Sequence, residues 1–264
     1  MKSVWVTLFI ILGMSCKEAP ESTKTEKTAT KEVVKEEISP YPEALKKVFD
    51  AHGGIDTWKS KQLLSFDILK GDQTEKHTIA LYSRDEKIEM PGISMGSQGD
   101  DIWLLDAEGM YKGDPVFYHN LMFYFYAMPF VFADEGIFYK DAEPLEFEGK
   151  RYPGIRIAYE DGVGLSAKDE YFLHYDPDTF QMVWLGYTVT FKSGEKSDNV
   201  RWIRYNDRMT VDGLLVPKSL TWYEYEGRTI KDARDPLVFD NVSFDEVSPS
   251  TDFFSKPEGA KIMN

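Results

Sequence analysis

Hydrophobic residues follow two different periods along this chain, and the change of period separates its elements. In "YPEALKKVFDAHGG", Leu45, Val48 and Phe49 recur at helical spacing, which predicts a helix near the start of the folded region. The Gly-Gly pair that follows predicts the end of this helix, because glycine adopts at little cost the left-handed backbone that a C-terminal cap requires. We expect His52 to cap the last turn, where a positive charge complements the helix dipole.

Alternation of hydrophobic and polar residues dominates the rest of the chain and predicts strands. The strand segments are "KQLLSFDILKG", "KHTIALYSRD", "EKIEMPGI", "DDIWLLDAEGMYKG", "KRYPGIRIAYED", "DEYFLHYDPDTFQMVWLGYTVTF", "NVRWIRYNDRMTVDGLLVPKSLTWYEYEG" and "LVFDNVSFDEV". Turn sequences such as "GDQTE", "DPDT" and "VDGL" lie between or within them. We therefore expect about nine to eleven strands and a mainly β protein with a minor helical part.

One hydrophobic segment interrupts this rhythm, "PVFYHNLMFYFYAMPFVFADEGI" from Pro115 to Ile137. Proline suits the first turn of a helix, and the pattern predicts one helix over residues 115–129, ended by Pro129. Phe117, Leu121, Phe125 and Met128 share one of its faces. Because the helix is hydrophobic almost all round, we expect it to be covered on more than one side.

The N-terminus resembles the signal peptide of a bacterial lipoprotein. "MKSVWVTLFIILGMSC" has a positive charge at Lys2, a hydrophobic run from Val4 to Leu12 and the only cysteine of the chain, Cys16. This pattern predicts a signal peptide over residues 1–15, lipidation of Cys16, and an outer-membrane lipoprotein on the periplasmic or cell-surface side of a bacterial envelope. The alternative is an ordinary secretory signal with an unrelated cysteine.

Residues 16–39 are rich in Lys, Glu and Thr and contain no aromatic residue. Such a segment buries too little hydrophobic surface to offset the entropy of ordering, so we expect a disordered tether. Residues 40–264 then form a single β-domain.

Composition and motifs exclude several classes of function. The net charge of −14 argues against nucleic-acid binding, and a single cysteine leaves no intramolecular disulfide. The four histidines are scattered, and HExxH, CxxC and GxSxG motifs do not occur. The Gly- and Ser-containing "EDGVGLSAKDE" is interpreted as a hairpin loop. We expect no metal, no cofactor and no catalytic residue; a zinc site or a hydrolase site assembled by folding from distant residues stays as an alternative.

Methionine and aromatic residues gather in the middle of the chain, where adaptable side chains suit a hydrophobic ligand. The candidate ligand-binding residues are Trp103, Phe117, Leu121, Met122, Phe125, Met128 and Phe130. The alternative is that these side chains form an ordinary core.

Several segments, in their order, resemble the LolA/LolB-like carrier superfamily of outer-membrane lipoprotein-sorting proteins. They are "AHGGIDTWKSKQLLSFDI", "DDIWLLDAEGMYKGD", "LEFEGKRYPGIRIAY", "YFLHYDPDTFQMVWL", "YNDRMTVDGLLVPKSLTW" and "FDNVSFDEVSPSTDFFSKP". The resemblance implies a strongly curved antiparallel sheet, an unclosed β-barrel, with helices covering its concave side. It also implies a non-enzymatic protein that holds an acyl chain, a lipid or a lipoprotein in an apolar cavity. Soluble carriers of the superfamily have no lipid anchor, so this chain is similar to a lipid-anchored branch of unknown role.

The alternative function is that of an interaction or structural lipoprotein. Such a protein has a filled β-core and recruits another envelope protein. An exposed hydrophobic patch beside a filled interior would favour it.

Overall fold

The structure, a computed structural model, describes residues 40–159, 169–190 and 197–263. They belong to one compact unit that begins at Ser39. The expected signal peptide, the lipidated Cys16 and the tether over residues 16–39 lie outside the described residues, as does most of the "EDGVGLSAKDE" loop.

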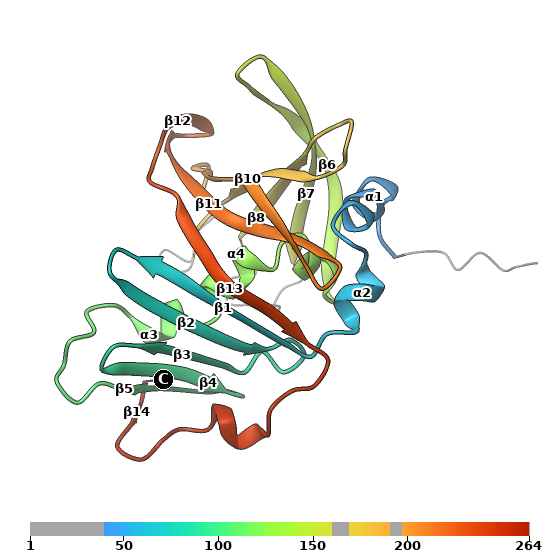
Figure 1. Cartoon of the computed structure of the whole chain (residues 1–264). Helices are drawn as coiled ribbons and strands as arrows, with labels where there is room; N and C mark the ends of the chain where they lie inside the picture. Colours follow the sequence, from blue (N-terminus) through green and yellow to red (C-terminus); the bar gives the residue numbers. More distant parts are fainter. Residues whose placement is uncertain (1–39, 160–168, 191–196, 264) are drawn as a thin grey trace, which may run out of the picture. The chain divides into compact units, whose positions relative to one another are not determined.

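The described residues form one antiparallel sheet of fourteen strands (Figure 1). The strands are β1 (Leu63–Lys70), β2 (Gln73–Ala80), β3 (Glu86–Met90), β4 (Ile93–Gln98), β5 (Asp101–Leu105), β6 (Ile137–Phe147), β7 (Lys150–Tyr159), β8 (Glu170–Tyr175), β9 (Met182–Tyr187), β10 (Arg201–Val211), β11 (Leu214–Glu226), β12 (Thr229–Ala233), β13 (Leu237–Asp245) and β14 (Lys261–Ile262). Their order is β14-β5-β4-β3-β2-β1-β13-β11-β10-β9-β8-β7-β6, and β12 pairs only with β11. The sheet is curved and unclosed, so the predicted fold class is confirmed.

The strand count exceeds the expected nine to eleven, because β4, β6, β12 and β14 escaped the pattern. β6 carries four charged residues and Pro144, so its sequence lacks clear alternation. Charges and proline are typical of an edge strand, where they hinder pairing with other chains. β6 is one end of the sheet, which explains why its composition differs from that of the interior strands.

Two helices precede the sheet and several short ones lie within the chain. α1 (Glu43–Ala51) forms as predicted and buries Leu45, Val48 and Phe49. α2 (Ile55–Lys59) follows directly, and its Trp58 stacks on Phe130 with ring centroids 4.8 Å apart. The remaining helices are α3 (Pro115–Tyr118), α4 (Leu121–Tyr126) and the 3-10 turns η1 (Phe130–Ala133) and η2 (Thr251–Phe254).

The prediction of one continuous helix over residues 115–129 was wrong. Asn120 has a left-handed backbone (φ 57°) and separates α3 from α4. Two tertiary hydrogen bonds hold this break: its backbone N–H donates to Glu86 Oε2 at 2.6 Å, and its side-chain amide donates to Arg84 O at 3.0 Å. The hydrophobic pattern contains no sign of either contact.

The end of α1 is docked on the turn between β10 and β11. His52 is the C-cap, as predicted, and its backbone oxygen accepts a hydrogen bond from Leu215 N at 2.9 Å. The expected positive charge on His52 was wrong, because burial lowers its pKa to about 4. Gly53 (φ 104°) touches the turn so closely that a Cβ would lie 2.2 Å from Gly213 O.

The sheet has two faces that both carry hydrophobic residues. We call the face covered by α1 and α4 the inner face; Figure 1 shows α4 in the hollow of the sheet. Alternate residues of each strand point to opposite faces, so Leu173 and Ile203 join the inner core while Phe172 and Trp202 lie on the outer face. Trp184 and Tyr152 also belong to this outer cluster.

Within the described ranges, no helix combines the length and hydrophobicity that crossing a membrane requires.

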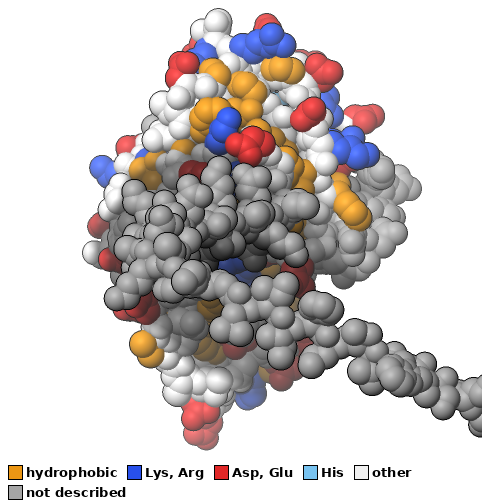
Figure 2. All heavy atoms as spheres, turned by 90° about the vertical axis from the view of Figure 1, so that its right-hand side faces the viewer, with side chains coloured by type: hydrophobic (Ala, Val, Ile, Leu, Met, Phe, Trp, Pro, Cys, Tyr) orange, Lys and Arg blue, Asp and Glu red, His pale blue; other side chains and the backbone are white. Residues whose placement is uncertain are grey.

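Figure 2 shows hydrophobic side chains exposed in the upper part of one side of the molecule. Basic and acidic side chains are interspersed around them. Among the side chains that the structure describes, this side therefore presents no continuous basic surface.

Candidate functional site

The structure separates the seven predicted ligand-binding residues into two groups. Leu121, Met122, Phe125, Met128 and Phe130 meet in or against the inner core, between the sheet and the helices. The other two residues lie outside this cluster.

Trp103 is buried on β5, where its indole N–H donates to Phe254 O at 3.0 Å, so its ring is fixed by η2. Phe117 is half-buried on α3. The seven side chains therefore do not share one lining.

The inner-face group packs as a core. Phe125 lies 5.1 Å from the ring of Tyr187 and 5.6 Å from that of Trp222, and Phe130 is 0% exposed. Ligand binding by these residues stays a prediction. Among the described residues, the segment from α4 to η1 packs against the inner face of the sheet.

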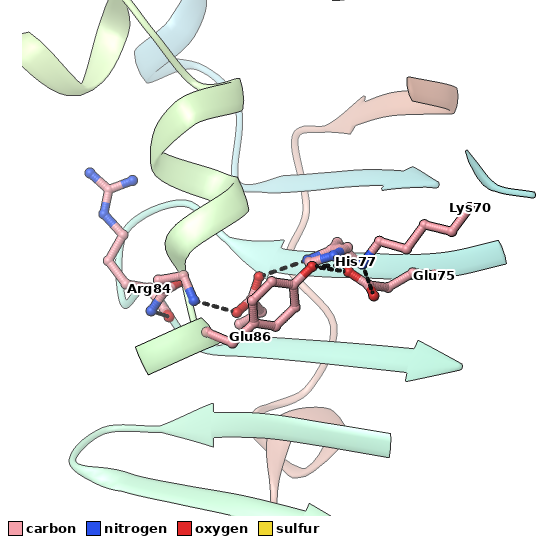
Figure 3. Close-up of polar contacts among 7 residues, drawn as sticks. Lys70, Glu75, His77, Arg84 and Glu86 are labelled. Atoms are coloured by element: carbon pink, nitrogen blue, oxygen red, sulfur yellow. Dashed lines mark hydrogen bonds and ion pairs between the residues drawn. The ribbon is translucent and has the colours of Figure 1, made fainter. Parts of the chain in front are cut away.

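A polar network lies at the edge of this core, where three strands and α3 meet (Figure 3). His77 on β2 stands between two carboxylates: its Nε2 is 2.8 Å from Glu75 Oε1 and its Nδ1 is 3.0 Å from Glu86 Oε1. Lys70 Nζ reaches Glu75 Oε2 at 2.7 Å, and the Tyr118 hydroxyl donates to Glu75. With protonated His77 the two cations balance the two carboxylates.

The network stabilises charges rather than exposing reactive groups. Burial alone would lower the pKa of His77, but the hydrogen bonds and charges of Glu75 and Glu86 raise it above 6.5. Burial alone would raise the pKa of Glu75, but its bonds to His77, Lys70 and Tyr118 lower it to about 2. His77 and Glu86 are both 0% exposed, so a substrate has no access to them. Among the described residues, no group of three or more His, Cys, Asp or Glu side chains could hold a metal ion.

The outer face carries a cleft of about 500 Å³. Its hydrophobic lining consists of Ala142, Pro144, Leu145, Phe172 and Trp202. Its polar lining consists of Asp141, Glu143, Arg156, Glu170, His174 and Arg228. The cleft begins at β6, where the register with β7 shifts between Ala142 and Leu145, and extends over β7, β8 and β10. None of the seven predicted residues lines it.

Two glycines shape the floor of this cleft. Gly186 on β9 lies under the ring of Trp202, and a Cβ there would be 2.8 Å from the indole. Gly154 on β7 lies under the His174 ring in the same way, and a Cβ at Gly154 would be 2.6 Å from the imidazole. Each ring can therefore lie across the neighbouring strand, and the two rings are 5.8 Å apart. The result is a trough that crosses the strands.

The charged groups of the cleft differ in their partners. Arg156 forms an ion pair with Glu170 on the next strand. Arg228, in the turn between β11 and β12, places its guanidinium 4.6 Å from the centroid of the Phe172 ring. Burial lowers the pKa of His174 to about 4, so this imidazole is neutral at physiological pH.

Sequence reasoning missed this cleft although a signal existed. Large hydrophobic residues occupy both odd and even positions in "EYFLHY", "MVWLGY" and "RWIRYN". This pattern indicates strands that are buried on both faces of the sheet. We assigned these segments to strands by alternation and did not use this signal. The positions of Gly154 and Gly186 opposite rings on neighbouring strands depend on register, which the sequence does not reveal.

The sequence matches no protein-family model, and no curated protein matches it. Solved structures similar to the chain include a DUF1329 family protein from Desulfovibrio piger, with 15% identity and a TM-score of 0.49, covering 81% of this chain and 98% of the other. A LolA superfamily protein from Nitrosomonas europaea has 9% identity and a TM-score of 0.48, with coverage of 81% and 96%. A domain from Vibrio parahaemolyticus described as a putative outer membrane lipoprotein-sorting protein has 10% identity and a TM-score of 0.44, with coverage of 77% and 96%. Two of these three structures carry names from the superfamily that the sequence motifs resemble.

Proposed function

We propose that this protein is a non-enzymatic binding protein for a hydrophobic or amphiphilic small molecule, and that the ligand binds in the outer-face cleft. The observation that carries the proposal is the trough of about 500 Å³ with the rings of Phe172 and Trp202 in its lining. Ligand sites of proteins typically enclose about 300–1,000 Å³ and combine hydrophobic walls with a few polar groups. The proposal keeps the predicted ligand class and moves the site away from the inner face.

The expected affinity follows from the size of the ligand. Each buried methylene contributes about 0.8 kcal/mol, so roughly ten methylenes supply about 8 kcal/mol. This corresponds to a Kd of about 1 μM before the costs of association are subtracted. Binding is therefore best measured at micromolar to millimolar ligand.

The chemistry of the cleft supports binding rather than catalysis. His174 is the histidine of the lining; it is buried, and its Nδ1 is engaged with Tyr152 O at 3.3 Å. A neutral, buried imidazole with a pKa of about 4 is a poor general acid or base at pH 7. Attachment to a bacterial envelope through lipidated Cys16 remains part of the proposal, as does a signal peptide over residues 1–15.

The second candidate function, recruitment of another envelope protein, is favoured by the filled inner core. Met122, Phe125 and Phe130 are buried there and pack against other hydrophobic residues, as in an ordinary core. In that case the protein would bind a partner protein through an exposed hydrophobic surface, and it would not bind a small ligand.

The test uses residues 17–264, which contain the whole compact unit with its own core. Displacement of a fluorescent fatty acid measures binding. Ala142→Phe fills the cleft from its half-exposed rim and is expected to weaken binding at least about 10-fold, whereas Phe125→Leu on the inner face leaves it unchanged. The reverse result would place the ligand on the inner face, and no saturable binding by the parent protein would favour the partner-recruiting function. Unfolding midpoints of both variants check that the fold is retained.

A further inference from the structure

We propose that the outer-face cleft selects amphiphiles with an anionic head group, a carboxylate or a phosphate. Arg228 binds the head group, and the trough formed by Phe172, Trp202 and Leu145 holds the alkyl chain. This inference rests on the proposed function and adds the charge of the ligand to it.

The position of Arg228 is fixed by the cleft itself. The indole N–H of Trp202 donates to Arg228 O at 3.1 Å, which ties the β11–β12 turn to the floor. The guanidinium stacks on Phe172 at 4.6 Å. A guanidinium stacked on a ring still presents N–H donors along its edge, and two of them match the oxygens of a carboxylate or phosphate.

The lining carries the carboxylates of Asp141, Glu143 and Glu170 and the guanidinium groups of Arg156 and Arg228, and the attraction for an anion lies at Arg228. Arg156 and Glu170 neutralise each other. Asp141 borders the cleft at β6, but it pairs in register with Ile155, an inner-core residue, so its carboxylate points to the inner face. Glu143 is exposed in the β6 bulge.

Among the residues that the structure describes, Arg228 forms no ion pair, so no described carboxylate compensates its charge. The face of the Phe172 ring could attract a cationic head group, but the guanidinium of Arg228 already lies over that ring. A cationic head group would therefore be repelled there.

The hydrophobic part of the cleft continues from the guanidinium across the sheet. Phe172 lies beneath Arg228, the Trp202 ring crosses β9 at Gly186, and Leu145 borders the trough at β6. The trough thus offers a guanidinium at the β11–β12 turn and hydrophobic side chains along its floor. This polarity fits a single-chain amphiphile with its head at the β11–β12 turn.

The test compares ligands that share one alkyl chain and differ in head group: dodecanoate, dodecyl phosphate, dodecanol and dodecyltrimethylammonium. At pH 8 and below micelle-forming concentrations, the parent protein is expected to bind the two anions at least about 10-fold more tightly than the alcohol. The cationic amphiphile is expected to bind most weakly. The preference for the anions is expected to shrink at high salt, because the head-group contact is partly exposed.

Arg228→Gln is the decisive variant, since the side chain is exposed and its loss leaves the core intact. It is expected to weaken dodecanoate binding about 10-fold while changing dodecanol binding less than about 2-fold. Arg151→Gln removes one exposed positive charge that lies outside the cleft lining and is expected to change neither.

Equal affinity of the parent protein for dodecanoate and dodecanol would overturn the head-group inference and leave the proposed function standing. Preference for one anion over the other would identify the head group. If none of the four amphiphiles binds, the proposed function fails as well.

Discussion

Replacing His77 by phenylalanine tests how the buried network holds the chain together. The phenyl ring keeps the planar shape that stacks on Phe66, whose ring centroid lies 4.8 Å from that of the imidazole. The substitution removes the cation between Glu75 and Glu86, and Glu86 then remains fully buried with Asn120 N–H as a hydrogen-bond donor. Removing one partner of a buried ion pair typically costs about 3–5 kcal/mol, because the remaining charge stays unpaired.

The pH dependence gives the prediction its sign. Because the folded state raises the pKa of His77, its stabilisation is fully present below 6.5, the ordinary value, and is lost as pH rises through the folded pKa. Glu75 acts in the opposite direction: its pKa of about 2 contributes stability above 4.5 that is lost as pH falls towards 2. We expect the network to stabilise the fold most between these two limits.

Urea unfolding followed by tryptophan fluorescence at pH 5 to 9 measures both effects. The parent protein is expected to lose stability as pH rises above 6.5, and His77→Phe is expected to lack that slope. His174→Phe is the matched control. Burial lowers the pKa of His174 to about 4, so the folded protein loses stability as pH falls from 6.5 towards 4. Of the two variants, only His174→Phe removes this loss of stability at acidic pH. Parallel pH profiles of the parent protein and His77→Phe, or a loss below about 1 kcal/mol, would refute the reasoning.

Three further outcomes are expected. Gly53→Ala is expected to lower the free energy of unfolding in urea by more than about 2 kcal/mol, because φ is 104° and the new Cβ would lie 2.2 Å from a backbone oxygen. A loss smaller than that of an ordinary glycine substitution would contradict the docking of α1. Gly186→Ala is expected to displace the Trp202 ring, since the Cβ would be 2.8 Å from it, and so to weaken amphiphile binding and change the near-ultraviolet circular dichroism; unchanged spectra would argue against the trough. A double-mutant cycle on Arg156 and Glu170 is expected to give a coupling of only about 0.2–1 kcal/mol, because the Arg156 side chain is 40% exposed; a larger value would mean that the pair is shielded from water.

The sequence was informative wherever a pattern is local. The spacing of Leu45, Val48 and Phe49 predicted α1, and alternation together with turn residues predicted most strands of the sheet. β6 escaped because an edge strand is built from charges and proline rather than from alternation.

The candidate site was predictable only in part. The hydrophobic character of the segment from residue 115 to 130 was recognised, and most of its candidate residues do meet on the inner face. Whether a hydrophobic segment lines a cavity or fills it depends on the distance between sheet and helix, which periodicity does not report. The break at Asn120 has the same origin, because its hydrogen-bond partners, Arg84 and Glu86, are more than thirty residues away in the chain.

By itself, the sequence determined that this protein is a mainly β domain with one N-terminal helix and an unusually hydrophobic central segment. Hydrophobic periodicity and turn residues act over a few neighbouring positions, so both can be recognised in the local sequence. Only the tertiary structure decided that His77 lies between two carboxylates and that Trp202 and His174 lie across Gly186 and Gly154. These contacts require particular residues of different strands to be neighbours. Strand register and sheet curvature set such neighbours, and they are properties of the whole sheet rather than of any one segment.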